Sequence, residues 1–313
     1  ETGTRVTLSI LRKGHAKALK FELLREEIKV ESVETFDLQS ASQTVRYVRI
    51  KNFQIATSQE LKNKLGDLAD ISGLVLDLRN NPGGLLEEAV RVSDLFLPGK
   101  QRIVSTKGSS VSTIHDAKQL FASTIYQDIP LVVLINRGSA SASEIVAAAL
   151  KQNKRAIVIG EQSFGKGTVQ TLWDLKDGSG LKLTIGEYLT PSGLSIHNIG
   201  VMPELSLIPV IVSPVKSHQG TDDQQQSFSQ ERFLLLTEEN TENSSVDLER
   251  FELRYLSAKV AVFDDASLSA EAEIIENLNA DIFVETAKRL LLTWNPEEIN
   301  SSLQQISREV SEQ

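Results

Sequence analysis

The 313-residue sequence contains no cysteine and only four histidines. Disulfide bonds are therefore excluded, while the redox compartment is left open. The histidines are scattered, and none has an aspartate at the spacing that a histidine-based triad or a zinc site would favour. They are His15, His115, His197 and His218. We interpret His197, which follows the glycine-flanked lysine described below, as a structural or surface residue.

Positive charge is also scarce. Lysine and arginine number 33 against 42 aspartates and glutamates, which gives a net charge of −9 and a pI near 5.2. No basic stripe is visible, so the composition argues against a nucleic-acid partner. No apolar run is long enough to span a bilayer. The length predicts one core domain and a smaller module.

A lysine flanked by two glycines is the most informative feature that is present. Such a lysine can hold a phosphate or act as a base toward a serine. Gly160 to Lys166 fits the first seven positions of a phosphate-binding P-loop, but Gly167 replaces the required Ser or Thr. The residues that follow alternate as in a strand, whereas a P-loop opens a helix. We therefore disfavour nucleotide binding.

A candidate nucleophile lies upstream of this lysine. The segment Ser141 to Gln152 is rich in alanine and predicts a helix between two short apolar runs typical of buried strands. Ser141 and Glu144 form a capping-box pattern, so the helix is expected to begin at this serine. Amides at a helix start favour negative charge nearby. Taken alone, the pattern also fits a simple N-cap, and Ser139 and Ser143 remain alternatives.

A lysine base must lose its proton near neutral pH, although free lysine titrates near about 10.4. Burial away from carboxylates lowers a lysine pKa. Phe164 could supply an apolar wall for Lys166, and the neutral Gln170 could orient its amine. We expect Glu161 to point away from Lys166. The alternative is a solvated lysine in a turn.

A third segment could stabilise an oxyanion. Residues 73–79 predict a strand, and residues 85–97 predict a helix. Asn80-Asn-Pro-Gly-Gly84 joins them, and such a junction exposes free amides at the carboxyl end of a strand, where open α/β sheets bind ligands. An ordinary tight turn is the alternative.

Together, these segments resemble a known family. Asp77–Gly84, Gly138–Glu144 and Phe164–Gly167 with Gln170 look like the signature of the C-terminal processing peptidases, also called tail-specific proteases. The motifs stand in the right order and spacing. The resemblance covers residues 3–208, or about two thirds of the chain.

The resemblance implies a serine endopeptidase that cleaves proteins or peptides near their C-termini through an acyl-enzyme. It makes Ser141 the nucleophile, Lys166 the general base and Gln170 the residue that positions the base. The oxyanion would be bound by the amides of Ala142 and of Gly83 or Gly84. No cofactor and no metal are implied. The family's usual location is extracytoplasmic, in the periplasm or an equivalent lumen, and a homo-oligomer or adaptor partner is compatible with it.

The same resemblance implies an α/β fold with a crotonase/Clp-peptidase-like core at residues 33–209. Residues 1–32 look like the closing strands of a truncated PDZ domain, and we expect them to pair with the core or with a partner. Residues 210–313 are expected to form a linker and a mostly helical accessory module. Its last helix is predicted to begin at Asn295 and end near Val310.

Two other classes of function stay open. One is a catalytically silent homologue that binds peptides or acts as a scaffold. The other is a crotonase-like acyl-CoA enzyme, which would share the implied fold but use a different base. The presence of Ser141, Lys166 and Gln170 at matching positions favours the peptidase.

Overall fold

A computed structural model shows how the chain folds. It divides into two compact units, Glu1–Glu31 and Ser32–Gln313. The structure describes residues 1–15, 17–26, 30–40, 43–108, 112–120, 125–210, 234–236, 251–256, 270–295 and 302–303.

The first unit is a β-hairpin. Strands β1 (Arg5–Ile10) and β2 (Leu19–Leu24) pair antiparallel, as their alternating pattern predicts. They form a two-stranded sheet of their own. The two strands satisfy their facing backbone groups with each other, and the expected pairing with the core or with a partner stays a prediction.

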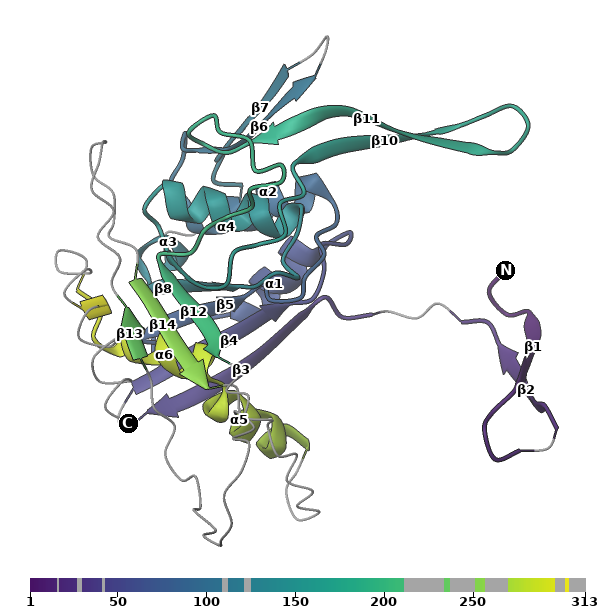
Figure 1. Cartoon of the computed structure of the whole chain (residues 1–313), viewed down its shortest axis with the longest axis horizontal. Coiled ribbons are helices and arrows are strands. Elements are labelled where there is room, and N and C mark those ends of the chain that lie inside the picture. The colour runs from purple at the N-terminus through teal and green to yellow at the C-terminus, as the bar shows by residue number, and fades with distance from the viewer. Residues whose placement is uncertain are drawn as a thin grey trace, which may run out of the picture. The chain divides into compact units, whose positions relative to one another are not determined.

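The second unit is built on an eight-stranded sheet with the order β13-β14-β12-β9-β8-β5-β4-β3 (Figure 1). The strands from β4 to β14 in this order are parallel, and β3 and β13 are antiparallel edges. Their bounds are β3 Val33–Ser40, β4 Gln43–Ile50, β5 Gly73–Asp77, β8 Leu131–Ile135, β9 Ile157–Gly160, β12 Leu205–Val210, β13 Leu234–Leu236 and β14 Phe251–Leu256. The central strands β5, β8 and β9 are buried along their whole length, as expected for parallel strands covered on both faces.

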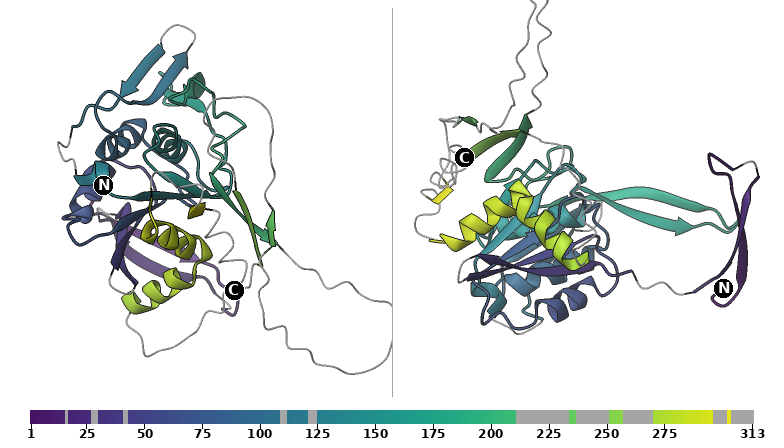
Figure 2. Two further views of the ribbon diagram at one scale, coloured as in Figure 1. Left: turned by 90° about the vertical axis from the view of Figure 1, so that its left-hand side faces the viewer. Right: turned by 90° about the horizontal axis from the view of Figure 1, so that it is seen from below.

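Helices cover both faces of this sheet (Figure 2). On one face lie α1 (Thr57–Leu65), α2 (Leu86–Phe96) and α4 (Ala142–Gln152), with the short α3 (Ile125–Asp128) beside them; on the other lie α5 (Ala270–Ala280) and α6 (Ile282–Leu292). Successive residues of β5 alternate between the faces, since Leu74 and Leu76 join one core cluster and Val75 joins the other. The α/β prediction is confirmed. Among the described helices, none has the length and apolar character needed to cross a bilayer.

The described part of the C-terminal third contains helices α5 and α6, and it also adds β13 and β14 to the main sheet. β14 pairs in parallel with β12 and thereby extends the main sheet. Helix α6 packs against the sheet through its apolar stripe, which includes Val284 and Leu290. This placement follows from burial, because without α6 one face of β5 and β8 would be exposed. Segments 211–233 and 237–250, and most of the helix predicted from Asn295, lie outside the described residues.

A second, antiparallel sheet has the order β10-β11-β6-β7. Its strands are β6 Arg102–Gly108, β7 Ser112–Asp116, β10 Thr168–Asp174 and β11 Gly180–Leu189. The β10–β11 hairpin extends away from the second unit's main sheet (Figure 1). β10 begins two residues after Lys166, where a P-loop would open a helix, so the rejection of nucleotide binding stands.

Candidate active site

Ser141 lies at the N-terminus of α4 in an unusual backbone conformation. It is the N-cap residue, with φ 56° and ψ −112°. Non-glycine residues with positive φ are uncommon and cost roughly 1–3 kcal/mol, so the surrounding structure must hold Ser141 in place. The predicted capping contact forms, because the Ser141 N–H donates to Glu144 Oε2 at 2.7 Å. The Ser141 hydroxyl makes no cap hydrogen bond.

The carboxylate of Glu144 joins the serine segment to the lysine segment. Glu144 is fully buried. Its Oε2 accepts from the backbone N–H groups of Ser141 at 2.7 Å and Lys166 at 2.9 Å. Its Oε1 accepts from the Ser163 hydroxyl and the Gly165 N–H, both at 2.6 Å. One carboxyl group therefore fixes the backbones of Ser141 and Lys166 side by side. Sequence reasoning recognised Glu144 only as a helix cap.

Lys166 is half-buried, and its backbone is tightly packed. A Cβ on Gly167 would lie 2.6 Å from the backbone nitrogen of His197, so only glycine fits there. Glu161, which was expected to point away from the lysine, pairs with Arg137 at 3.4 Å. In the described part of the chain, Lys166 forms no ion pair. Phe164 is 67% exposed, so it does not supply the expected buried wall.

Gln170 lies on β10, directly after a bulge between Val169 and Gln170, and is exposed. Bulges redirect side chains at the edges of sheets and next to active sites. The Ser141 hydroxyl, the Lys166 amine and the Gln170 amide are not hydrogen-bonded to one another in this structure. The fold thus joins the Ser141 and Lys166 backbones through Glu144, while their side chains are not hydrogen-bonded to each other.

The Pro-Gly-Gly segment touches the serine. A Cβ on Gly83, which has φ 98°, would lie 2.8 Å from the Ser141 Cβ and 2.9 Å from the Ala142 nitrogen. The Gly83 N–H donates to Asn81 Oδ1 at 2.9 Å and is already engaged. Within the described residues, the N–H groups of Gly84 and Ala142 have no acceptor. Of these two residues, Ala142 directly follows Ser141, and Gly84 directly follows the glycine that contacts Ser141.

Asn81 was missed by sequence reasoning, although it connects the two loops. It is fully buried, and its carbonyl accepts from the Ala140 N–H at 3.0 Å and the Ser143 hydroxyl at 2.9 Å. Ser139 is also fully buried, and its hydroxyl donates to the Leu78 carbonyl at 2.8 Å. The hydroxyls of Ser139 and Ser143 are therefore occupied, and Ser141 is the serine that remains available. The Asn-Pro-Gly turn was the only local signal for Asn81.

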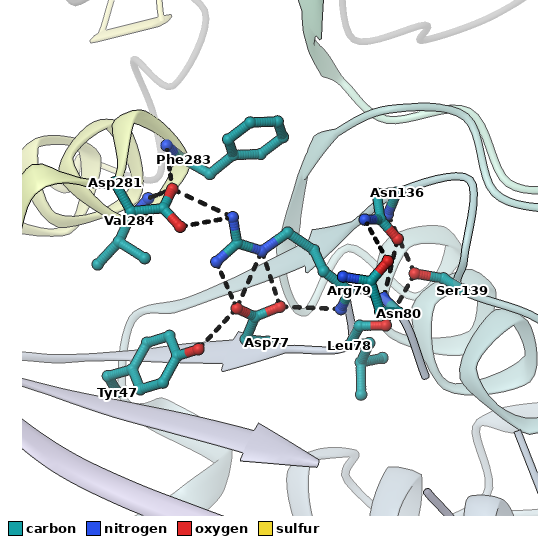
Figure 3. A network of polar contacts seen from close by, with 10 residues as sticks. All are labelled: Tyr47, Asp77, Leu78, Arg79, Asn80, Asn136, Ser139, Asp281, Phe283 and Val284. Atoms are coloured by element: carbon teal, nitrogen blue, oxygen red, sulfur yellow. Dashed lines mark hydrogen bonds and ion pairs between the residues drawn. The ribbon is translucent and has the colours of Figure 1, made fainter. Parts of the chain in front are cut away.

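Behind this loop lies a buried charged network (Figure 3). Asp77 accepts from the Tyr47 hydroxyl at 2.7 Å and from Arg79 Nη2 at 2.6 Å. Burial and the Asp77 charge both raise the pKa of Tyr47, so it remains a neutral donor. Burial opposes the charge on Arg79, but attraction to Asp77 and Asp281 outweighs it and raises the pKa of the guanidinium. Arg79 therefore remains a cation within the network.

A cavity of about 220 Å³ lies between α2 and β7, lined in part by Asp94 and His115. It contains none of the candidate residues.

The sequence and the fold agree with one family. Residues 44–207 match the model of peptidase family S41. The chain belongs to this family. Among its relatives are a carboxy-terminal-processing protease of Bartonella bacilliformis, 43% identical over 211 residues, and a carboxyl-terminal-processing protease of Synechocystis sp., 39% identical over 206 residues. These alignments cover 65% and 64% of this chain, and 47% of each relative.

The structure is also similar to a solved S41-like protein. A photosystem II D1 C-terminal processing protease superimposes with a TM-score of 0.52 and 34% identity. The match covers 66% of this chain and 56% of that one. The chain spans about half the length of the curated relatives it matches. The family resemblance inferred from the three motifs is thus confirmed.

Proposed function

We propose that this chain is the peptidase core of a serine endopeptidase that cleaves protein substrates near their C-termini. Membership of peptidase family S41 and the names of the relatives support the reaction and the substrate class. The single observation that carries the assignment of the residues is the Glu144 carboxylate, which binds the backbones of both Ser141 and Lys166.

In the proposed mechanism, Lys166 in its uncharged form accepts the proton of the Ser141 hydroxyl as the oxygen attacks the scissile carbonyl. Gln170 orients the amine by hydrogen bonding. The resulting ammonium protonates the leaving amine, and water activated by Lys166 then releases the acyl group from Ser141. The mechanism requires the Lys166 and Gln170 side chains to move into hydrogen-bonding contact, while Glu144 binds the backbone N–H groups of Ser141 and Lys166.

We assign the oxyanion hole to the N–H groups of Ala142 and Gly84. The Ala142 amide stands at the positive end of α4, where developing negative charge is favoured. Gly84 is preferred to Gly83 because the Gly83 N–H already donates to Asn81. Gly83 instead lets the loop approach Ser141 without a side chain in the way. Losing one such donor typically costs on the order of 3 kcal/mol in the transition state.

The proposal includes an extracytoplasmic location, in the periplasm or an equivalent lumen, as the family resemblance implies. One relative, from Tetradesmus obliquus, is named a chloroplastic C-terminal processing peptidase and is 39% identical over 175 residues. A homo-oligomer or an adaptor protein is a compatible partner, and residues 1–32 are proposed to be the closing strands of a PDZ domain. Cell fractionation with an antibody against the chain tests the location.

Cleavage of casein, an unfolded protein, tests the enzyme. We expect turnover by the chain, and a loss of at least about a thousandfold in Ser141→Ala and in Lys166→Ala, with both variants still folded. Ser112→Ala is the matched control, since this exposed serine lies on β7 and takes no part in the contacts described around Ser141. Equal activity in the chain, Ser141→Ala and Lys166→Ala would overturn the assignment. Absence of cleavage together with peptide binding would instead favour a silent homologue.

A further inference from the structure

Arg79 is the last residue before the Asn80–Gly84 loop, and both its backbone and its side chain are anchored. Its N–H donates to Asp77 Oδ1 at 2.8 Å. Its Nε also donates to Asp77, at 3.0 Å and 2.9 Å to the two oxygens. Only 15% of the Arg79 side chain and 2% of that of Asp77 are exposed. The start of the loop is therefore held by a charged group that solvent barely reaches (Figure 3).

The Nη1 nitrogen of the Arg79 guanidinium contacts helix α6. Arg79 Nη1 lies 2.8 Å from Asp281 Oδ2. Asp281 is also the N-cap of α6, because its Oδ1 accepts from the Phe283 N–H at 2.9 Å. The guanidinium stacks over the Phe283 ring, 5.0 Å from its centre. The first turn of α6 is thus attached to the residue from which the loop begins.

From Arg79, the hydrogen bonds continue toward the nucleophile. The Asn80 N–H donates to Asn136 Oδ1 at 2.9 Å, and Asn136 Nδ2 donates back to Asn80 Oδ1 at 3.0 Å. The Asn81 carbonyl then binds the residues on either side of Ser141, as described above. The loop has little freedom to move without moving Arg79.

We propose that the Arg79–Asp281 ion pair positions the Asn80–Gly84 loop for catalysis, so that docking of α6 sets the geometry of the oxyanion site. The inference rests on the proposed function. Arg79 and Asp281 are positioning residues, since neither touches the reacting atoms. Asp281 and α6 lie outside residues 44–207, the part that matches the family model. The C-terminal segment of this chain is therefore an active part of the peptidase unit.

A purely structural role is the competing explanation, because partly buried ion pairs also hold elements together. The two roles differ in what they change. A structural pair alters the free energy of unfolding, whereas a positioning pair alters kcat in protein that is still folded. The affinity for a tetrahedral adduct would follow kcat, because the adduct needs the same amides.

Asp281→Asn in the full chain tests the proposal, since asparagine keeps an acceptor for the helix cap but removes the charge that binds Arg79. We expect kcat on a peptide ester to fall by at least about fivefold, with KM within twofold. The affinity for a peptide boronate, which forms a tetrahedral adduct on Ser141, should fall by the same factor. Asp281→Glu should restore part of both.

The matched control is Glu285→Gln on the same helix, because among the described residues the ion pairs of Glu285 run along α6, to Lys288 and Arg289. It should retain wild-type kcat and boronate affinity. If Asp281→Asn does not fold, Phe283→Leu, which removes the ring beneath Arg79, carries the same test. Wild-type kcat in folded Asp281→Asn, or an equal loss in Glu285→Gln, would overturn the proposal. Cleavage by Ser141→Ala would instead overturn the proposed function itself.

Discussion

The residue on which the candidate site depends most is Glu144, which never touches substrate in the proposed mechanism. A buried carboxylate that accepts four donors has all its charge compensated by fixed dipoles, which makes the contacts strong and directional. Glu144 thereby holds a strained serine at the end of a helix and a lysine at the start of a strand. The geometry of the pair is set by a third residue.

Glu144→Gln is expected to separate the two segments. The amide NH2 of glutamine would face backbone N–H groups that need an acceptor, and each buried donor left unpaired costs about 1–3 kcal/mol. We predict a loss of about 2–4 kcal/mol in the free energy of unfolding, measured with urea. We also predict a fall in kcat of at least about tenfold on casein.

Glu161→Gln provides the comparison for this prediction. Glu161 precedes Lys166 closely in sequence, but its partner Arg137 is 89% exposed. Exposed pairs contribute about 0–1 kcal/mol, so this variant should stay close to wild type in both measurements. Full activity and full stability of Glu144→Gln would show that the carboxylate is not needed to hold the two segments together.

The same residues show how much of the candidate site can be predicted from sequence alone. Ser141, Lys166 and the Gly83–Gly84 pair were predicted because each sits in a local pattern, a helix start or a glycine turn. The buried bonds of Glu144 and Asn81 were not, because they form between loops that are distant along the chain. The periodicity of apolar residues predicts which face of a helix or strand is buried. It does not predict which loops lie next to each other in the folded chain.

At the scale of elements, local patterns predicted the strands β5, β8, β9 and β10 and the helices α2 and α4, and they indicated helical character in the C-terminal segment. They did not predict that α6 covers the main sheet. Nor did they place β14, since its parallel pairing with β12 is a contact between segments separated by a long connection. The apolar face of α6 nevertheless predicts that the helix packs against another apolar surface, and in the structure that surface is the main sheet.

Leu290→Ala tests whether α6 belongs to the core of the second unit. Leu290 is fully buried in the cluster that contains Val75 and Leu134. Truncating a buried leucine costs about 2–5 kcal/mol. We predict that the main unfolding transition in urea shifts by this amount. Leu292→Ala, on the half-buried side of the helix, should cost clearly less. An unchanged main transition in Leu290→Ala would mean that α6 unfolds independently of the sheet.

For the molecule as a whole, stability should depend on pH through one buried acid. Glu204 is 2% exposed and directly precedes β12. Its Oε2 accepts from the Val158 N–H at 2.7 Å, while Lys151 Nζ lies 3.7 Å from Oε1. Burial raises the pKa of Glu204, and the lysine and the backbone N–H offset this only in part. The folded chain therefore holds this proton more tightly than the unfolded chain.

The sign of the effect follows from that difference. A carboxyl whose pKa is raised in the folded state stabilises the fold most below the ordinary glutamate pKa. This contribution is lost as the pH rises through the raised value. Glu204→Gln removes the titration but keeps an acceptor for Val158. We predict that the stability of this variant relative to wild type increases as the pH rises from the ordinary glutamate pKa of about 4.3 to the raised pKa of the folded chain. Urea midpoints across that range measure it, and a relative stability that is flat or falls with pH would contradict the assignment of Glu204 as a destabilised buried charge.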